Sequence, residues 1–172
     1  MKKNCVYSFH VKDREPIQGI FLKEDQDWIH AKWIFTDYII TGDILINKEY
    51  LVKTDRGNRD IFKEKVLRAS KKISSPHQVP IPLKTKDLFE YLFENSKIFE
   101  VYNKEDSKLN LAKIVKLSEK TFQAQLLGTK GLWLEDEFAF VIRYIRMIGV
   151  NTDYVNSLVA YNESLNKGNV SG

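Results

Sequence analysis

Cysteine is almost absent from this sequence, and this limits the chemistry that the chain can support. The 172 residues include a single cysteine, Cys5. One cysteine cannot form a disulfide within the chain, so nothing in the sequence indicates an oxidising compartment. The three histidines lie in no metal-binding motif, and cysteine and histidine do not cluster as a zinc site requires. We therefore predict no bound metal and no cofactor.

Long apolar runs are also missing. The longest are far shorter than the roughly 20 residues that a membrane-spanning helix needs. After the basic start Met1-Lys2-Lys3, polar residues interrupt the region where a signal peptide has an apolar stretch. We expect no membrane-spanning segment and, because no other address is present, a cytoplasmic location.

Glycine and proline are sparse, with eight and four residues, which argues against long flexible linkers. Hydrophobic residues make up 43% of the chain and charged residues 29%, which is typical of a globular protein. The three tryptophans, eight tyrosines and ten phenylalanines each bury a large area, so even small modules can form a core.

Positive charge exceeds negative charge only slightly. The net charge is +4, and residues 1–75 carry all of the excess, with 15 Lys and Arg against 11 Asp and Glu. Residues 76–172 hold 12 of each kind. A dedicated nucleic-acid binder shows a larger and more clustered excess. A solvated surface with a small basic bias is therefore the preferred interpretation.

The first 70 residues predict several short strands and one helix. Ile29, Ala31 and Trp33 alternate with polar neighbours, which is the period of a half-buried strand. Further strands are predicted over residues 17–22, 38–40, 44–46 and 50–52, before a break at residues 55–58. The period then becomes helical over residues 59–71, with the following apolar residues on the predicted inner side: Ile61, Phe62, Val66, Leu67 and Ala69.

A proline-containing connection and a second series of elements follow. Residues 74–82 hold three prolines and predict an extended linker. Thr85 is a candidate cap for a helix with apolar residues on one face. Strands are then predicted from residue 98 to residue 148, and a closing helix after Thr152-Asp153.

The two halves align when the chain is shifted by 93 residues. Seven identities occur over residues 21–69, and they include Thr36 with Thr129, Asp43 with Asp136 and Asn58 with Asn151. The alternation leaves phase between residues 44 and 50, which predicts a small insertion or deletion there. We interpret the pattern as one supersecondary unit copied once. The alternative is that two β-rich stretches merely resemble each other.

The segment from Gly19 to Lys32 resembles the Sm-like proteins, which form small SH3-type barrels. Gly19 is followed six residues later by Asp25, which is the spacing of the first Sm motif with its aspartate at the strand turn. The resemblance implies that each half folds as a small barrel, a form that removes exposed sheet edges.

The sequence departs from the Sm pattern where that family contacts RNA. Ile29 stands near the position of the family's RNA-contacting asparagine, and Asn47-Lys48 replaces its Arg-Gly pair. In the second half, Ala112 and Ser118 stand at the positions of the glycine and the aspartate. The uridine-binding chemistry of the family is therefore not carried over, and only the barrel is expected.

No motif for catalysis is present, and we predict that the protein is not an enzyme. Nucleophilic catalysis needs a nucleophile beside an oriented base, and no histidine lies in such a motif. Gly128 and Gly131 lack the spacing of a phosphate-binding loop. The acidic run at residues 135–137 lacks further ligands at the spacing of a calcium loop, so we interpret it as a solvated turn. An enzyme without a recognisable motif is the alternative.

Two features indicate binding. Trp28, His30 and Lys32 alternate on the polar side of a predicted strand, where His30 is interpreted as a surface residue and an outward indole can stack on a base or anchor a protein. The alternative for Trp28 is that the helix after the linker, or the other half, covers it. The basic residues Arg59, Lys63 and Arg68 lie on the first helix, where they either neutralise phosphates or form a solvated helix face.

Together these patterns predict a mainly β protein with helices, α+β in class, built from two tandem small SH3/Sm-like β-barrels, each followed by a helix. The predicted parts are residues 1–72, a linker and helix over 73–97, and residues 98–172. The favoured function is a non-catalytic binding or scaffold protein with a protein partner. The alternative is a weak RNA- or DNA-binding protein that uses the aromatic and basic face of the first barrel.

Overall fold

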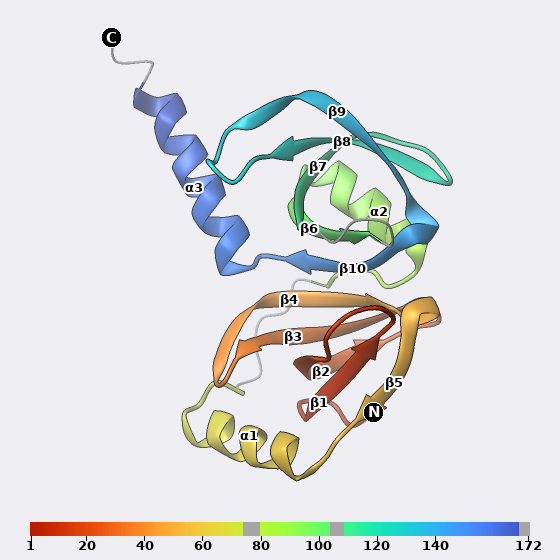
Figure 1. Ribbon diagram of the computed structural model, residues 1–172, viewed down its shortest axis with the longest axis vertical. Helices are drawn as coiled ribbons and strands as arrows, with labels where there is room; N and C mark the ends of the chain where they lie inside the picture. Colours follow the sequence, from red (N-terminus) through yellow and green to blue (C-terminus); the bar gives the residue numbers. More distant parts are fainter. Residues whose placement is uncertain (74–79, 104–108, 169–172) are drawn as a thin grey trace. The chain divides into compact units, whose positions relative to one another are not determined.

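The structure is a computed structural model that describes residues 1–73, 80–103 and 109–168 (Figure 1). Antiparallel strands dominate these ranges, together with three α-helices, so the expectation of a mainly β protein with helices is confirmed. The chain divides into two compact units, residues 1–88 (first unit) and residues 89–172 (second unit). Within the described residues, no helix combines the length and apolar character needed to cross a membrane.

The first unit is a five-stranded antiparallel arrangement followed by a helix. Its strands run in the order β5-β1-β2-β3-β4, so the first strand pairs with both the second and the fifth. The elements are β1 (Val6–Val11), β2 (Ile17–Glu24), β3 (Trp28–Thr36), β4 (Ile39–Asn47), a 3-10 turn (Lys48–Tyr50), β5 (Leu51–Asp55) and α1 (Asn58–Ala69).

The second unit has the same order of elements. Its strands run in the order β10-β6-β7-β8-β9, with a 3-10 turn before the last strand. The elements are β6 (Ile98–Asn103), β7 (Asn110–Leu117), β8 (Thr121–Leu127), β9 (Trp133–Val141), the 3-10 turn (Ile142–Tyr144), β10 (Ile145–Val150) and α3 (Asp153–Gly168). The helix α2 (Thr85–Glu94) contains the boundary between the units. Most of the predicted linker, residues 74–79 with His77, lies outside the described residues.

Equivalent strands of the two units begin 92 to 94 residues apart, and two of the five pairs begin 93 residues apart. β2 begins at residue 17 and β7 at residue 110, while β3 begins at 28 and β8 at 121. Both units also have a register shift at the same place, between Phe21 and Lys23 in β2 and between Ile114 and Lys116 in β7. Such bulges are retained features of a fold rather than defects. Shared order, spacing and bulge together support a duplicated unit.

The predicted position of the insertion is wrong, and the strand register places it earlier. Lys32 lies opposite Asp43 in the first unit, whereas Gln125 lies opposite Glu137 in the second. Lys32 and Gln125 are 93 residues apart, whereas Asp43 and Glu137 are 94 residues apart. The second unit therefore has one additional residue in β9, between Trp133 and residue 137, where the register shifts. The structural counterpart of Asp43 is Glu137, not Asp136.

Each unit has its own apolar core. In the first unit, Leu67 of α1 packs with Val6, Ile20 and Ile34. At Gly19 the strands β2 and β3 approach closely, since a Cβ atom there would lie 3.0 Å from the Ala31 side chain and from the Lys32 carbonyl oxygen. In the second unit, Phe122 stacks on Phe140 with the ring centroids 5.0 Å apart. Val155 of α3 packs there with Leu111 and Leu127.

Candidate functional site

Trp28, predicted to point outward, is fully buried. Its indole N–H donates a hydrogen bond to the hydroxyl of Thr85, the first residue of α2, at 3.1 Å. The backbone N–H and the hydroxyl of Thr85 both donate to the carboxylate of Asp27, each at 2.8 Å. The helix after the linker therefore covers Trp28, as the alternative interpretation held. A buried indole is not available to stack on a nucleic-acid base.

His30 is also buried, so its interpretation as a surface residue is wrong. Its Nε2 atom donates to Oδ1 of Asp43 at 2.8 Å, and Nζ of Lys32 donates to the other carboxylate oxygen at 2.9 Å. Burial opposes ionisation of Asp43, but the hydrogen bonds and charges of His30 and Lys32 outweigh it and lower the pKa of this carboxyl. Nδ1 of His30 has no hydrogen-bond partner within the described residues.

This cluster of His30, Lys32 and Asp43 belongs to the first unit alone. The strand register places Gln123, Gln125 and Glu137 at the equivalent positions of the second unit. Two of the six predicted binding residues, His30 and Lys32, are thus brought together by one buried aspartate. A carboxylate that accepts hydrogen bonds from both side chains explains why these polar groups are tolerated inside the unit.

The three basic residues predicted on the first helix have different surroundings. Lys63 is buried and donates from Nζ to Oε1 of Gln18 at 2.6 Å. Burial lowers the pKa of Lys63, and the positive charge of Arg59 adds to this effect. Arg68 donates to Glu64 at 3.0 Å and to the backbone oxygen of Asn4 at 2.6 Å. Of the three, Arg59 has an exposed side chain and forms no ion pair within the described ranges.

Glu64 is the centre of the contacts between α1 and the strands. It accepts hydrogen bonds from the backbone N–H of Val6 at 3.0 Å, from Arg56 at 2.9 Å and from Arg68 at 3.0 Å. Burial by itself raises the pKa of a carboxyl, but these donors outweigh it and lower the pKa of Glu64 to about 2. Arg56 and Arg68 therefore both bind Glu64, and Arg68 also connects α1 to the backbone of Asn4.

The inner face of α1 is polar, contrary to the prediction from its apolar residues. Asp60 accepts from the Ser8 hydroxyl and from the Gln18 side chain, each at 2.8 Å. Phe62, predicted to point inward, is 60% exposed, whereas Leu67 is fully buried. The polar strand residues Ser8 and Gln18 pair with polar groups of the helix, whereas Leu67 packs against the apolar part of the strands.

The exposed edge strand β9 was not predicted from the sequence. In its unit β9 pairs only with β8, and residues 134–139 are all exposed. Glu135, Asp136 and Glu137 lie within this strand, so their interpretation as a turn is wrong. These three carboxylates have no ion-pair partner in the part of the chain that the structure describes. Leu134 and Phe138, which flank the acidic run, are exposed as well.

The equivalent strand of the first unit has a different environment. Ile44 lies opposite Ala31, and Phe138 lies opposite Ala124, so Ile44 and Phe138 are counterparts. Ile44 is fully buried, whereas Phe138 is 40% exposed. In β4 all residues from Asp43 to Asn47 are buried, which covers both faces because side chains alternate along a strand. One position of the repeated fold is thus covered in one unit and open in the other.

Apolar residues are also exposed at the equivalent hairpins of both units. Ile39 at the β3–β4 hairpin is 53% exposed, and Leu132 at the β8–β9 hairpin is 52% exposed. These residues are 93 positions apart. Phe35, whose ring contacts Trp33 at a centroid distance of 6.0 Å, adds a further exposed aromatic side chain to the first hairpin.

Neither a cluster of metal ligands among the described residues nor a similarity to known proteins indicates a function. Among the described residues, no three His, Cys, Asp or Glu side chains lie close enough together to hold a metal ion. No family model, no curated protein and no solved structure matches this chain. The function must therefore be inferred from the surfaces that the two units present.

Proposed function

We propose that this chain is a non-catalytic protein-interaction module and that β9 of the second unit is its binding strand. The observation that carries the proposal is the exposure of residues 134–139, of which residues 137–139 contrast with their buried counterparts in the first unit, residues 43–45. A strand that is covered in one copy of a fold and open in the other is a position where the second copy can accept another chain.

The proposed mode of binding is strand addition. An edge strand presents unpaired backbone N–H and C=O groups, and an extended segment of a partner can pair with them. Backbone hydrogen bonds then supply affinity, while the side chains that flank the edge select the sequence. Leu134 and Phe138 provide apolar contacts at two points along β9.

The proposed partner is an extended segment that alternates apolar residues with Lys or Arg. β9 contains three carboxylates and no basic residue. These carboxylates repel acidic segments and attract basic ones, which sets specificity and the association rate more than affinity. Because the charges are exposed, binding should weaken as salt rises.

The test uses the full chain and a displayed library of random 12-residue peptides. We expect selected peptides to alternate apolar and basic residues. Their affinity, measured by fluorescence polarisation with a labelled synthetic copy, should fall at least tenfold in Phe138→Ser and in the triple variant Glu135→Lys/Asp136→Lys/Glu137→Lys. Phe62→Ser, which replaces an exposed phenylalanine on α1, is the matched control and should bind as the parent does.

Two results would contradict the proposal. Peptides that lack basic residues, or that bind the β9 variants as tightly as the parent, would place the binding surface elsewhere. Self-association of the triple variant without any loss of peptide binding would mean that the acidic run serves only to keep an edge strand from pairing.

Nucleic-acid binding, the alternative function, has less support than peptide binding. Trp28 is buried, and Lys63 and Arg68 are engaged within the first unit. A labelled single-stranded RNA titrated at low and moderate salt tests this alternative. Micromolar binding that weakens with salt and is lost in Arg59→Glu would favour it over the peptide-binding proposal.

At the level of the fold, we also propose that each unit is a small SH3-type barrel of the kind found in Sm-like proteins. Three features support this: five strands, a 3-10 turn before the last strand, and pairing of the first strand with the last. Cross-strand nuclear Overhauser effects between Phe9 and Thr54, and between Val101 and Ile148, test that closure. Their absence would contradict it.

A further inference from the structure

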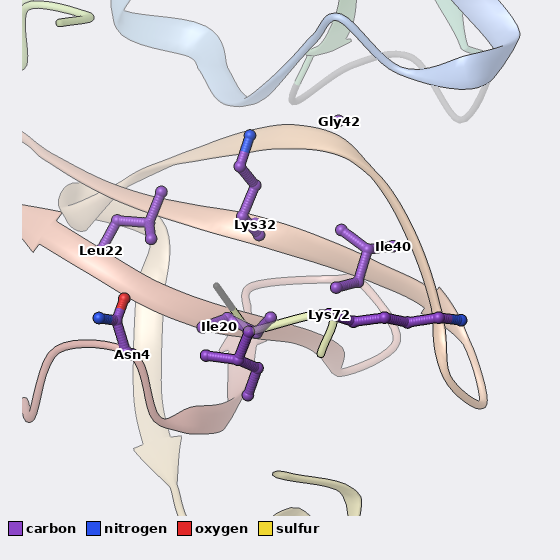
Figure 2. A pocket seen from close by; sticks show the side chains of 8 residues that line it. Asn4, Ile20, Leu22, Lys32, Ile40, Gly42 and Lys72 are labelled. Atoms are coloured by element: carbon purple, nitrogen blue, oxygen red, sulfur yellow. The ribbon is translucent and has the colours of Figure 1, made fainter. Parts of the chain in front are cut away.

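A small pocket in the first unit lies next to the cluster of His30, Lys32 and Asp43. Its volume is about 140 Å³, and its apolar lining comes from Ile20, Leu22, Ile40 and Ile73 (Figure 2). Ile20 and Leu22 are buried side chains of β2, so they form a fixed apolar wall. A cavity of about 150 Å³ in another protein accommodates benzene, so this pocket suits a ligand of roughly six to eight non-hydrogen atoms.

Two lysines also line the pocket. Lys32 and Lys72 line the pocket with their aliphatic stems, and Figure 2 shows their amino ends at its periphery. Each ammonium group has three hydrogens. Among the described residues, Lys32 donates one to Asp43 and Lys72 donates one to the Tyr38 carbonyl oxygen. Both lysines therefore keep donors for a ligand.

Asn4 adds a neutral polar group to the same pocket. Its backbone N–H donates to the Phe21 carbonyl oxygen, and its own carbonyl oxygen accepts from Arg68. Both backbone groups are thus engaged, whereas the carboxamide forms no hydrogen bond within the described residues and can serve a ligand. Asp43 pairs with Lys32, whereas Lys72 bonds a neutral carbonyl oxygen, so the net positive charge that a ligand meets comes from Lys72.

We propose that this pocket binds a short branched aliphatic carboxylate, with isovalerate as the representative ligand. The branched chain fills the apolar wall, and the carboxylate lies at the rim near the lysines. The proposal is independent of peptide binding at β9, because all lining residues belong to the first unit. For so few atoms a dissociation constant on the order of 1 mM is expected.

The test is a titration of the full ¹⁵N-labelled chain with isovalerate, followed by amide chemical shifts. We expect saturable shifts at Ile20 and Gly42, which line the pocket. Isovaleramide, which has the same shape without the charge, should bind at least tenfold more weakly. Acetate, which has the charge without the branched chain, should give no saturation in the same range.

A pair of lysine variants completes the test. Lys72→Met should weaken isovalerate binding at least tenfold, whereas Lys65→Met, at an exposed lysine of α1 outside the pocket, should leave it unchanged. Equal binding of isovaleramide and isovalerate would overturn the proposal, as would equal shifts with acetate or no saturable shift at Ile20 and Gly42. Loss of binding in Lys65→Met would indicate a general attraction of anions and would overturn it too.

Discussion

Trp28 of β3 and Thr85 of α2 are joined by a hydrogen bond of 3.1 Å from the indole N–H to the threonine hydroxyl. The two residues are separated by 57 positions along the chain. This contact explains why the most conspicuous aromatic residue of the predicted binding face is unavailable to a ligand. It also makes the start of α2 part of the first unit's packing.

Replacing Thr85 with valine should destabilise the first unit by about 1–2 kcal/mol. The substitution keeps the shape but removes the acceptor of the buried indole N–H and one donor to Asp27. Urea denaturation measures the change in the free energy of unfolding. Thr85→Ser keeps the hydroxyl and should retain most of the stability. Equal stability of the valine and parent proteins would show that this hydrogen bond contributes nothing.

Acidification should weaken the docking of α1 through Glu64. Its pKa is lowered from 4.5 to about 2, so the unfolded chain takes up a proton at a higher pH than the folded chain. The stabilisation is complete above about pH 4.5 and is lost as the pH falls toward 2. We expect Glu64→Gln to cost roughly 2 kcal/mol at neutral pH, allowing for the partial exposure of Arg68.

The pH dependence separates this effect from simple loss of a side chain. The stability difference between Glu64→Gln and the parent should shrink as the pH is lowered from 4.5 to 2, because protonation removes the charge from the parent too. Thermal unfolding at a series of pH values measures it. A difference that stays constant across this range would contradict the proposed origin of the lowered pKa.

Gly19 and Gly57 should respond differently to alanine. A Cβ at Gly19 meets the Ala31 side chain and the Lys32 carbonyl oxygen at 3.0 Å, whereas one at Gly57 meets nothing within 4 Å. We expect Gly19→Ala to destabilise the first unit by about 1–3 kcal/mol through overpacking. Gly57→Ala should change stability by less than about 1 kcal/mol. Similar denaturation midpoints for Gly19→Ala and the parent would show that the strands separate readily.

Two apolar residues of α1 should also differ. Phe62→Ser should change the free energy of unfolding by less than about 0.5 kcal/mol, because the side chain is largely exposed. Leu67→Ala should cost about 2–5 kcal/mol, because it leaves a cavity in the core formed with Val6 and Ile20. Denaturation of the two variants side by side is the measurement. A larger cost for Phe62→Ser would mean that its ring is covered in solution.

Local order along the chain was predictable from the sequence. The helix predicted over residues 59–71 is observed over Asn58–Ala69, and Thr85, the predicted cap of the next helix, is the first residue of α2. These elements follow from caps and from apolar spacing, which are local signals. The duplication was visible as well, because strand order depends on the same signals.

What covers each face was not predictable. Alternation correctly placed Trp28, His30 and Lys32 on one side of a strand, but it does not tell whether that side is open. The covering groups, Thr85 and Asp43, come from other parts of the chain. Burial of a polar side chain depends on such a distant partner, and a single sequence does not show the pairing.

The open strand β9 had a partial signal in the sequence. Three acids stand between Leu134 and Phe138, whereas the equivalent part of the first unit, which ends at Ile44, contains a single acid, Asp43. This difference was not recognised, because residues 135–137 were interpreted as a turn and not as part of a strand. Without the strand register, the additional residue in β9 could not be located, and the two segments could not be compared position by position.

The position of α2 has a practical consequence for dissecting the molecule. Thr85 at its start serves Trp28 and Asp27, whereas Phe89, one turn later, packs its ring 5.4 Å from that of Phe122. A fragment that stops before residue 85 loses the first set of partners, and one that begins after residue 89 loses the second. Expression of the two units apart therefore calls for overlapping fragments, each of which keeps the whole helix.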